Sequence, residues 1–188
     1  MTSPQIKTFK VEELHFDYKN PRLAEFAADS RATDEDILKL LWETMAVDEI
    51  VLSIAASGFF PHEQLIVTEE NINGTPKLIV VEGNRRLAAV KAILKPHLVE
   101  HLINSDAVQG VRDEIKQSLR ELPAIRVASR EDAWKFIGFK HISGAAKWGS
   151  YAKAQYISQI HEEFEIPLKD IARQIGDTNQ TVLKMYQG

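Results

Sequence analysis

The 188-residue sequence contains no cysteine. Disulfides, thiolate metal sites, iron–sulfur clusters and thiol catalysis are therefore excluded, and any metal must be bound by oxygen or imidazole ligands. Glycine and proline are few, and 44% hydrophobic residues against 27% charged residues exclude collagen-like, low-complexity and disordered chains. No apolar run approaches the roughly 18 residues that span a bilayer, and the first residues lack the basic-then-apolar order of a secretion signal. We therefore expect a cytoplasmic protein of one or two folded domains with no membrane partner.

Charge is distributed unevenly along the chain. The net charge is −4, but residues 1–80 hold 14 acidic and 7 basic side chains, whereas residues 81–188 hold 13 acidic and 16 basic ones. The basic excess is strongest between positions 126 and 153. This segment is either a solvated helix face or a surface that meets phosphates.

Hydrophobic periodicity predicts a mixed first part and a helical second part. Strands are expected at 6–14, 65–68, 78–81 and 124–127, with a hairpin turn at 71–76. Thr33 to Asp36 forms a capping-box start for a helix that extends to about 45, and Gly58 is expected to end a helix over 48–57. Further helices are expected at 85–94, 97–103, 110–121, 130–139 and 150–164, followed by two short helices. The predicted domain boundary separates residues 1–128 from residues 129–188.

The segment from Leu78 to Lys91 predicts a strand, a glycine turn and a helix whose first turn carries two arginines. Gly83 lets the backbone approach an anion without a Cβ in the way, and the helix start favours negative charge. Arg85 and Arg86 can add charge-assisted hydrogen bonds. Glu82 could hold Mg²⁺, act as a catalytic base, or neutralise an arginine. The alternative is an ordinary helix start with two surface arginines.

Residues Glu82–Ala89 resemble the Gly-Glu-Arg-Arg-x-Arg-Ala box of the ParB-type partition proteins of bacteria, and Asn20-Pro21-Arg22 resembles an earlier segment of that family. The resemblance implies an α+β fold of the ParB/sulfiredoxin type: a small mixed sheet with flanking helices, followed by an all-α region. Sulfiredoxin activity itself is excluded, because it requires a cysteine.

In ParB proteins the box binds nucleotide phosphates, and CTP controls a clamp on DNA. The resemblance therefore implies that Gly83, Asn84, Arg85 and Arg86 hold the triphosphate of a nucleotide, CTP or ATP, with Mg²⁺ on Glu82. Asn84 stands where ParB has Glu, and Ala88 replaces the last Arg of the box. The base is therefore not carried over from the family.

A second phosphate box of the ParB family, Glu-Asn-x-x-Arg, has no clear counterpart. The corresponding region is Lys140–Lys147, where His141, Ser143 and Lys147 could contact phosphates from a glycine-containing loop. The alternative is an ordinary loop between domains.

The segment Ile166–Leu183 resembles a helix-turn-helix, because Ala172, Gly176 and Val182 have the spacing of its packing positions. Four polar side chains would then project from the second helix toward base edges or phosphates: Thr178, Asn179, Gln180 and Lys184. Few of the surrounding residues are basic, so weak or partner-assisted DNA binding is expected. A plain helical hairpin is the alternative, and the chain's end just beyond it suggests a fragment of a longer protein.

The sequence thus predicts a nucleotide-binding, DNA-associated protein, with a nucleotide, DNA and a second copy of the chain as partners. One alternative is an enzyme of the same fold, a nuclease, a small-molecule phosphotransferase or a nucleoside triphosphatase, with Glu82 as the catalytic carboxylate. The other is a regulatory adaptor without catalysis.

Overall fold

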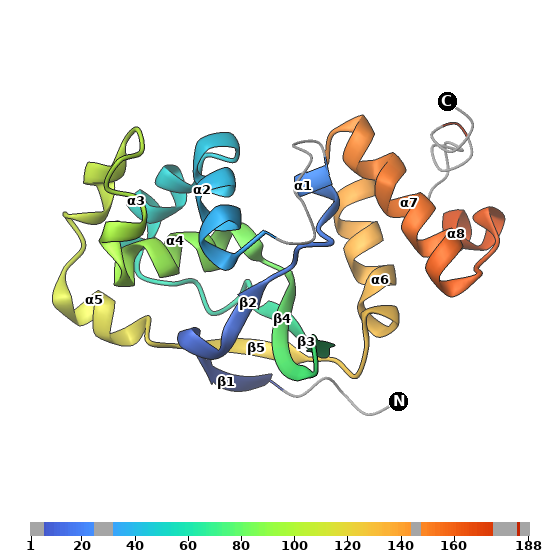
Figure 1. Cartoon of the computed structure of the whole chain (residues 1–188), viewed down its shortest axis with the longest axis horizontal. Coiled ribbons are helices and arrows are strands. Elements are labelled where there is room, and N and C mark those ends of the chain that lie inside the picture. The colour runs from blue at the N-terminus through green and yellow to red at the C-terminus, as the bar shows by residue number, and fades with distance from the viewer. Residues whose placement is uncertain (1–5, 25–31, 144–147, 175–183, 185–188) are drawn as a thin grey trace. The chain divides into compact units, whose positions relative to one another are not determined.

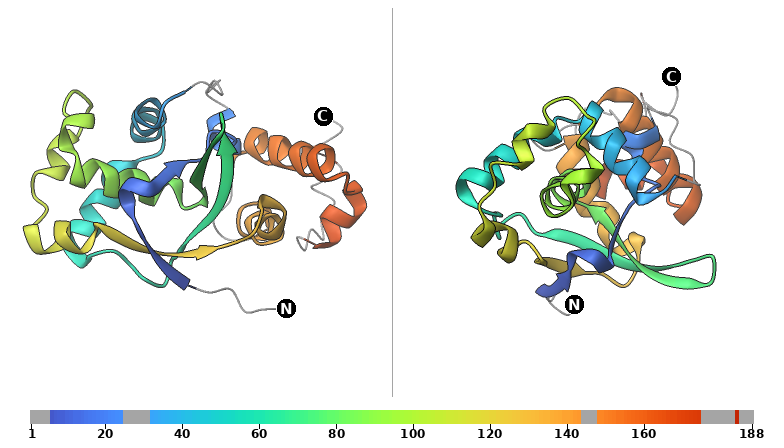
Figure 2. Two further views of the ribbon diagram at one scale, coloured as in Figure 1. Left: turned by 60° about the horizontal axis from the view of Figure 1, so that its bottom comes forward. Right: turned by 60° about the vertical axis from the view of Figure 1, so that its left-hand side comes forward.

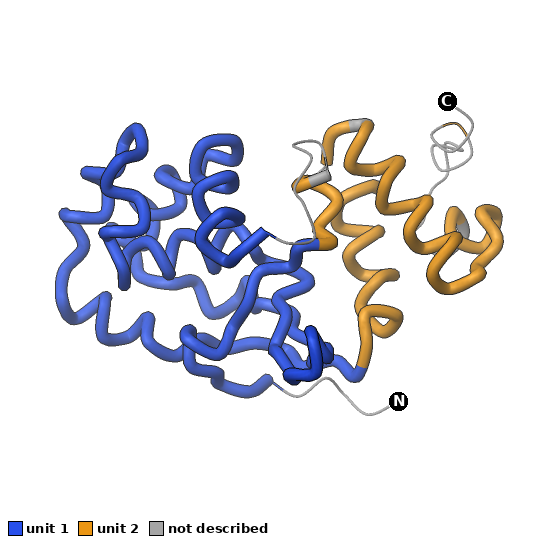
Figure 3. The backbone as a smooth tube through the Cα atoms, viewed as in Figure 1, with its two compact units in different colours: residues 1–18, 29–128 blue, residues 19–28, 129–188 orange. Residues whose placement is uncertain are grey.

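The computed structural model describes residues 6–24, 32–143, 148–174 and 184. The chain divides into two compact units (Figure 3): unit 1 takes residues 1–18 and 29–128, and unit 2 takes residues 19–28 and 129–188. Within the described ranges, no helix has both the length and the apolar character needed to cross a membrane.

Unit 1 is built on a five-stranded mixed sheet with the strand order β1-β5-β3-β4-β2 (Figure 1). The β3–β4 and β1–β5 pairs are antiparallel, whereas the β2–β4 and β3–β5 pairs are parallel. Together with its helices, this sheet confirms the predicted α+β class. The strands are β1 (Ile6–Lys10), β2 (Leu14–Phe16), β3 (Leu65–Ile72), β4 (Thr75–Glu82) and β5 (Glu121–Arg126).

The predicted hairpin is confirmed. Asn73 and Gly74 form its two-residue turn, and both have positive φ, 53° and 82°. Such a turn matches the twist of two antiparallel strands. β3 pairs with β5 only from Leu65 to Val67, so the tip of the hairpin extends past the end of β5 (Figure 2).

The continuous strand expected over 6–14 is wrong. A 3₁₀ turn at Val11–Glu13 separates β1 from β2, and these two strands lie at opposite edges of the sheet. Val11 and Leu14 are both buried, with 3% and 0% exposure. These two apolar residues are three positions apart, as in a turn, whereas the residues on one face of a strand are two positions apart. The turn lets the chain cross from one edge to the other.

In unit 1, the observed helix ends match the predicted ones where capping residues define them. Thr33 caps α2 with the predicted capping box, and Gly58 follows α3 with φ of 77°. The helix expected at 97–103 is reduced to a 3₁₀ turn at Pro96–Leu98. The helix expected at 110–121 is shorter at both ends, and β5 begins at Glu121. The helices are α2 (Asp34–Thr44), α3 (Val47–Ser57), α4 (Asn84–Leu94) and α5 (Asp113–Ser118).

Helix α4 is central to the core of unit 1. Seven of its eleven residues are buried, and it packs against α2 and α3. Ala88 and Ala89 have no exposed surface, and small side chains at such positions let neighbouring elements approach closely. Leu87 and Val90 are also fully buried. Packing around this helix holds its N-terminal turn in a defined place.

The described part of unit 2 is helical. Tyr156 of α7 donates a hydrogen bond from its hydroxyl to the carbonyl oxygen of Trp134 in α6, at 2.8 Å, and also meets the ring of Trp148 edge-on. The helix predicted at 150–164 is confirmed. The helical segments are α1 (Pro21–Ala24), α6 (Arg130–Gly138), a π-helix (Phe139–Ser143), α7 (Ser150–Phe164) and α8 (Leu168–Gln174).

Candidate functional site

The candidate site is the turn between β4 and α4, where Gly83 follows the last residue of the strand. Gly83 has φ of 102° and ψ of 21°, a left-handed backbone conformation that residues other than glycine rarely adopt. A Cβ built at this position would lie 2.4 Å from Cδ2 of Leu65 and 3.1 Å from Nη2 of Arg86. Glycine is therefore required here by both backbone geometry and space.

Asn84, the first residue of α4, is 4% exposed and joins three parts of unit 1. Its Oδ1 accepts a hydrogen bond from the backbone N–H of Asp17 at 3.0 Å, and its Nδ2 donates to the carbonyl of Val80 at 2.7 Å. These bonds connect the residue after β2, strand β4 and the start of α4. The side chain that the sequence assigned to a triphosphate thus also holds the turn in place.

Arg85 and Arg86 both lie against neighbouring backbone rather than extending into water. Nη2 of Arg85 donates to the carbonyl of Ala46 at 3.2 Å, and Nη2 of Arg86 donates to the carbonyl of Gln64 at 3.4 Å. Nε of Arg85 and Nη1 of Arg86 are buried and have no hydrogen-bond partner in the described part of the chain. A buried N–H without an acceptor costs about 1–3 kcal/mol, so an acceptor placed here would be stabilising.

The charge of Arg86 is only partly compensated. Its side chain is 14% exposed, and burial lowers the pKa of its guanidinium because the charged form loses water. The carboxylates of Glu63 and Glu82 act in the opposite direction on this pKa. Oε2 of Glu63 lies 3.7 Å from Nε of Arg86.

Glu82 is 8% exposed at the end of β4, and its charge raises the pKa of Arg86 against the effect of burial. Across the described residues, no three His, Asp or Glu side chains converge into a possible metal site. An Mg²⁺ ion held by Glu82 would therefore need its other ligands from water or from a bound phosphate. The arrangement favours Glu82 as the neutralising partner of an arginine.

The remaining predicted phosphate residues belong to unit 2. His141 is 5% exposed and stacks on Trp148 with ring centroids 4.4 Å apart and an interplanar angle of 5°. The backbone N–H of Trp148 also donates to the carbonyl of His141 at 2.9 Å. Ser143 ends the π-helix, and Lys147 lies outside the described residues.

The predicted DNA-contact residues fall almost entirely outside the described ranges. Thr178, Asn179 and Gln180 are not described, whereas Lys184 is helical and exposed. The first helix of the predicted helix-turn-helix corresponds to α8, which buries Ile171 to 1% exposure.

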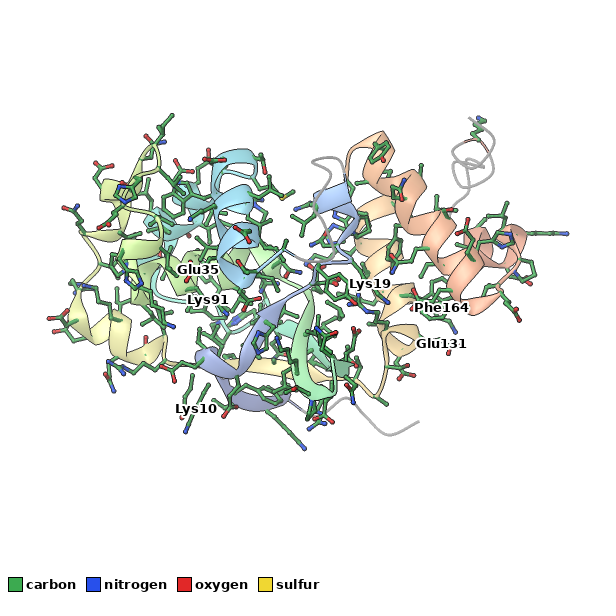
Figure 4. All side chains as sticks on the ribbon, viewed as in Figure 1. Lys10, Lys19, Glu35, Lys91, Glu131 and Phe164 are labelled. Carbon is green, nitrogen blue, oxygen red and sulfur yellow. The ribbon has the colours of Figure 1, made fainter. Side chains whose placement is uncertain are left out.

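Sequence reasoning missed the residues that surround the two arginines. Four groups from distant parts of the sequence approach the turn: the carbonyls of Ala46 and Gln64, the backbone N–H of Asp17 and the carboxylate of Glu63. Carbonyl and N–H groups belong to almost every residue, so no sequence signal marks those that converge on a site. Figure 4 shows the side chains of the molecule, with Lys91 marking helix α4.

Proteins similar to this chain are found among solved structures. No protein-family model matches the chain, and no curated protein matches it. Among solved structures, the chain is similar to the C-terminally truncated chromosome-partitioning protein ParB from Caulobacter crescentus, determined as a complex with CTP-γ-S. The two are 16% identical, the match covers 96% of this chain and 76% of that one, and the TM-score is 0.40.

Proposed function

We propose that this protein binds a nucleotide through its phosphates at the turn from Gly83 to Arg86. The observation that carries the proposal is a pair of buried guanidinium nitrogens, Nε of Arg85 and Nη1 of Arg86. Neither has a hydrogen-bond partner among the residues that the structure describes. Both belong to the first turn of an eleven-residue helix. Two such donors in one turn suit an anion with several acceptor oxygens.

Phosphate fits this turn for three further reasons. The first backbone N–H groups of a helix have no intrahelical acceptor, and the helix dipole adds partial positive charge at the same end. The lack of a side chain at Gly83 lets the guanidinium of Arg86 lie close to the backbone of the turn. Guanidinium groups bind phosphate oxygens through paired, directional hydrogen bonds.

The nucleotide part of the proposal rests on the sequence resemblance of residues 82–89 to the ParB phosphate box. In this proposal Glu82 neutralises Arg86 and does not act as a base. Asn84 replaces the family's Glu, so CTP and ATP are both candidates.

Isothermal titration calorimetry with CTP, ATP and inorganic tripolyphosphate, each with and without Mg²⁺, tests the site. We expect Arg85→Ala and Arg86→Ala each to weaken binding by roughly 10- to 100-fold, the value of a charge-assisted hydrogen bond. Arg86→Lys keeps the charge but loses the planar donor pair, so it should bind between wild type and Arg86→Ala.

Arg112→Ala is the matched control, because Arg112 is an exposed arginine of unit 1 and its loss changes the net charge equally. Circular dichroism checks that each variant is folded. Wild-type protein that binds none of the three compounds, or arginine variants that bind as tightly as Arg112→Ala, would contradict the phosphate site.

We also propose that residues 166–184 contact DNA as a helix-turn-helix. Support comes from the sequence pattern and from α8, which occupies the position of the first helix. Selection from a randomised duplex pool at low and moderate salt, with and without nucleotide, measures this. Asn179→Ala or Gln180→Ala should relax sequence preference, and Lys184→Ala should weaken binding to all sequences and lower the salt slope by about one unit.

Lys95→Ala, which removes an exposed lysine from unit 1, is the control for this experiment. If no sequence is enriched and affinity is the same for Lys184→Ala and Lys95→Ala, the segment is a helical hairpin that serves packing or partner contact.

A further inference from the structure

Glu63 and Gln64 approach Arg86 from the segment between α3 and β3. Oε2 of Glu63 lies 3.7 Å from Nε of Arg86, and the carbonyl of Gln64 accepts from Nη2 at 3.4 Å. Nε and Nη2 belong to the same guanidinium group as Nη1, which has no hydrogen-bond partner among the described residues and which the proposed phosphate would bind. Glu63 therefore lies against the guanidinium group that a phosphate would use.

The two carboxylates near Arg86 differ in their freedom to move. Glu82 is 8% exposed at the end of a central strand, so its position is determined by the fold. The side chain of Glu63 is 68% exposed, and its 3.7 Å separation from Nε is an ion-pair contact rather than a close hydrogen bond. Glu63 can turn toward water while the backbone of its segment stays in place.

We propose that Glu63 is an internal competitor for the phosphate site: its carboxylate and a bound anion compete for Arg86. This inference rests on the proposed function and concerns the regulation of the same site. A phosphate bound at Nη1 shares the charge of one guanidinium group with Glu63 at Nε, and the two negative charges repel each other at a separation well below the Debye length. The contact lowers the affinity of the site for every anion, so that weakly bound anions are excluded.

Titration of the full chain with inorganic tripolyphosphate tests the competition. Glu63→Gln removes the charge and keeps the size of the side chain, and we expect it to tighten binding roughly two- to fivefold, the range for a weak exposed ion pair. Glu63→Asp keeps the charge but shortens the side chain by one methylene. It should also tighten binding if the contact with Arg86 is what opposes the ligand.

Glu100→Gln is the matched control. It changes the net charge by the same amount, its side chain is 57% exposed, and it pairs with His101 rather than with an arginine of the site. Urea unfolding should show nearly equal stability for all three variants, because exposed ion pairs contribute little to folding.

The outcomes separate this inference from the proposed function. Tighter binding by both Glu63 variants, with Glu100→Gln equal to wild type, supports the competition, as does binding that appears only when Glu63 is replaced. If wild type binds and Glu63→Gln binds equally or more weakly, or if Glu63→Asp equals wild type, the competition is overturned and the phosphate site stands. If no protein binds, the phosphate site and the inference both fail.

Discussion

At the residue scale, Gly83 determines the geometry of the candidate site. Its φ of 102° turns the chain from β4 into α4, and the space beside it is filled by the fully buried Leu65 and by the guanidinium of Arg86. A side chain at this position would disturb a buried leucine and an arginine of the site together. The requirement for glycine is therefore stronger than at an exposed turn.

Replacement of Gly83 by alanine should lower both stability and phosphate binding. The left-handed backbone costs about 1–2 kcal/mol for alanine, and overpacking against Leu65 adds about 1–3 kcal/mol. Displacement of Arg86 should weaken tripolyphosphate binding beyond the stability loss. Urea unfolding and calorimetry measure the two effects.

Gly74→Ala is the control for that comparison. Gly74 has a similar φ of 82°, but no atom of the described residues lies within 4 Å of the Cβ that alanine would add. It should therefore show only the backbone cost and unchanged binding. Equal destabilisation by the two substitutions would show that the packing around Gly83 is unimportant.

At the scale of elements, Asp34, the first residue of helix α2, connects strand β2 with helix α4. Asp34 accepts a hydrogen bond from the backbone N–H of Phe16 at 3.2 Å and pairs with Lys91 at 3.0 Å. His15 also contacts Asp34, with Nδ1 3.1 Å from Oδ2. The position of Asp34 depends on the capping box of Thr33 that begins the helix.

Replacement of Thr33 by alanine should cost about 1 kcal/mol of stability, the usual value of an N-cap. Hydrogen bonds from Thr33 lower the pKa of Asp36 below its ordinary value of 3.8. A carboxyl whose folded pKa is depressed stabilises the fold above its unfolded pKa and loses that contribution as pH falls through the folded value. The difference between wild type and Thr33→Ala should therefore be largest above about pH 5 and narrow below about pH 4.

Urea unfolding at several pH values measures this difference. Thr44→Ala, at the other end of the same helix, is the control, because its hydroxyl only bonds back to the carbonyl of Leu40 and caps no free N–H. A difference for Thr33→Ala that is no larger than that for Thr44→Ala, or that grows in acid, would show that the capping box does not stabilise α2.

At the scale of the whole molecule, the candidate phosphate residues from Glu82 to Arg86 all belong to unit 1. The three tryptophans report on the units separately, because Trp42 lies in unit 1 and Trp134 and Trp148 lie in unit 2. A chain of two compact units need not unfold in a single transition. Fluorescence can therefore follow each unit by itself.

Bound tripolyphosphate should stabilise unit 1 more than unit 2. At a ligand concentration 100 times the Kd, the expected gain in the free energy of unfolding is about 2.7 kcal/mol. Thermal unfolding of a Trp134→Phe/Trp148→Phe variant follows Trp42, and a Trp42→Phe variant follows unit 2. An equal shift in both variants would show that the two units unfold together, and a shift only in unit 2 would contradict a phosphate site in unit 1.

The sequence alone determined the features that depend on a few neighbouring residues. Thr33 and Asp36 predict the start of α2, Gly58 predicts the end of α3, and Asn73-Gly74 predicts the hairpin turn. Each of these signals acts through the local backbone, which either requires a left-handed residue or needs an acceptor for a helical N–H. The strand, glycine and helix around Gly83 were predictable for the same reason.

Only the tertiary structure decided how distant segments meet. The chain crosses from β1 at one edge of the sheet to β2 at the other. Pro123 falls inside β5, where it pairs with Thr8 of β1. The acceptors around Arg85 and Arg86, and the approach of Glu63, arise from the packing of α4 against the segments that precede it. Hydrogen bonds and ion pairs of this kind depend on distances between atoms that are far apart along the chain, and packing of the core sets those distances.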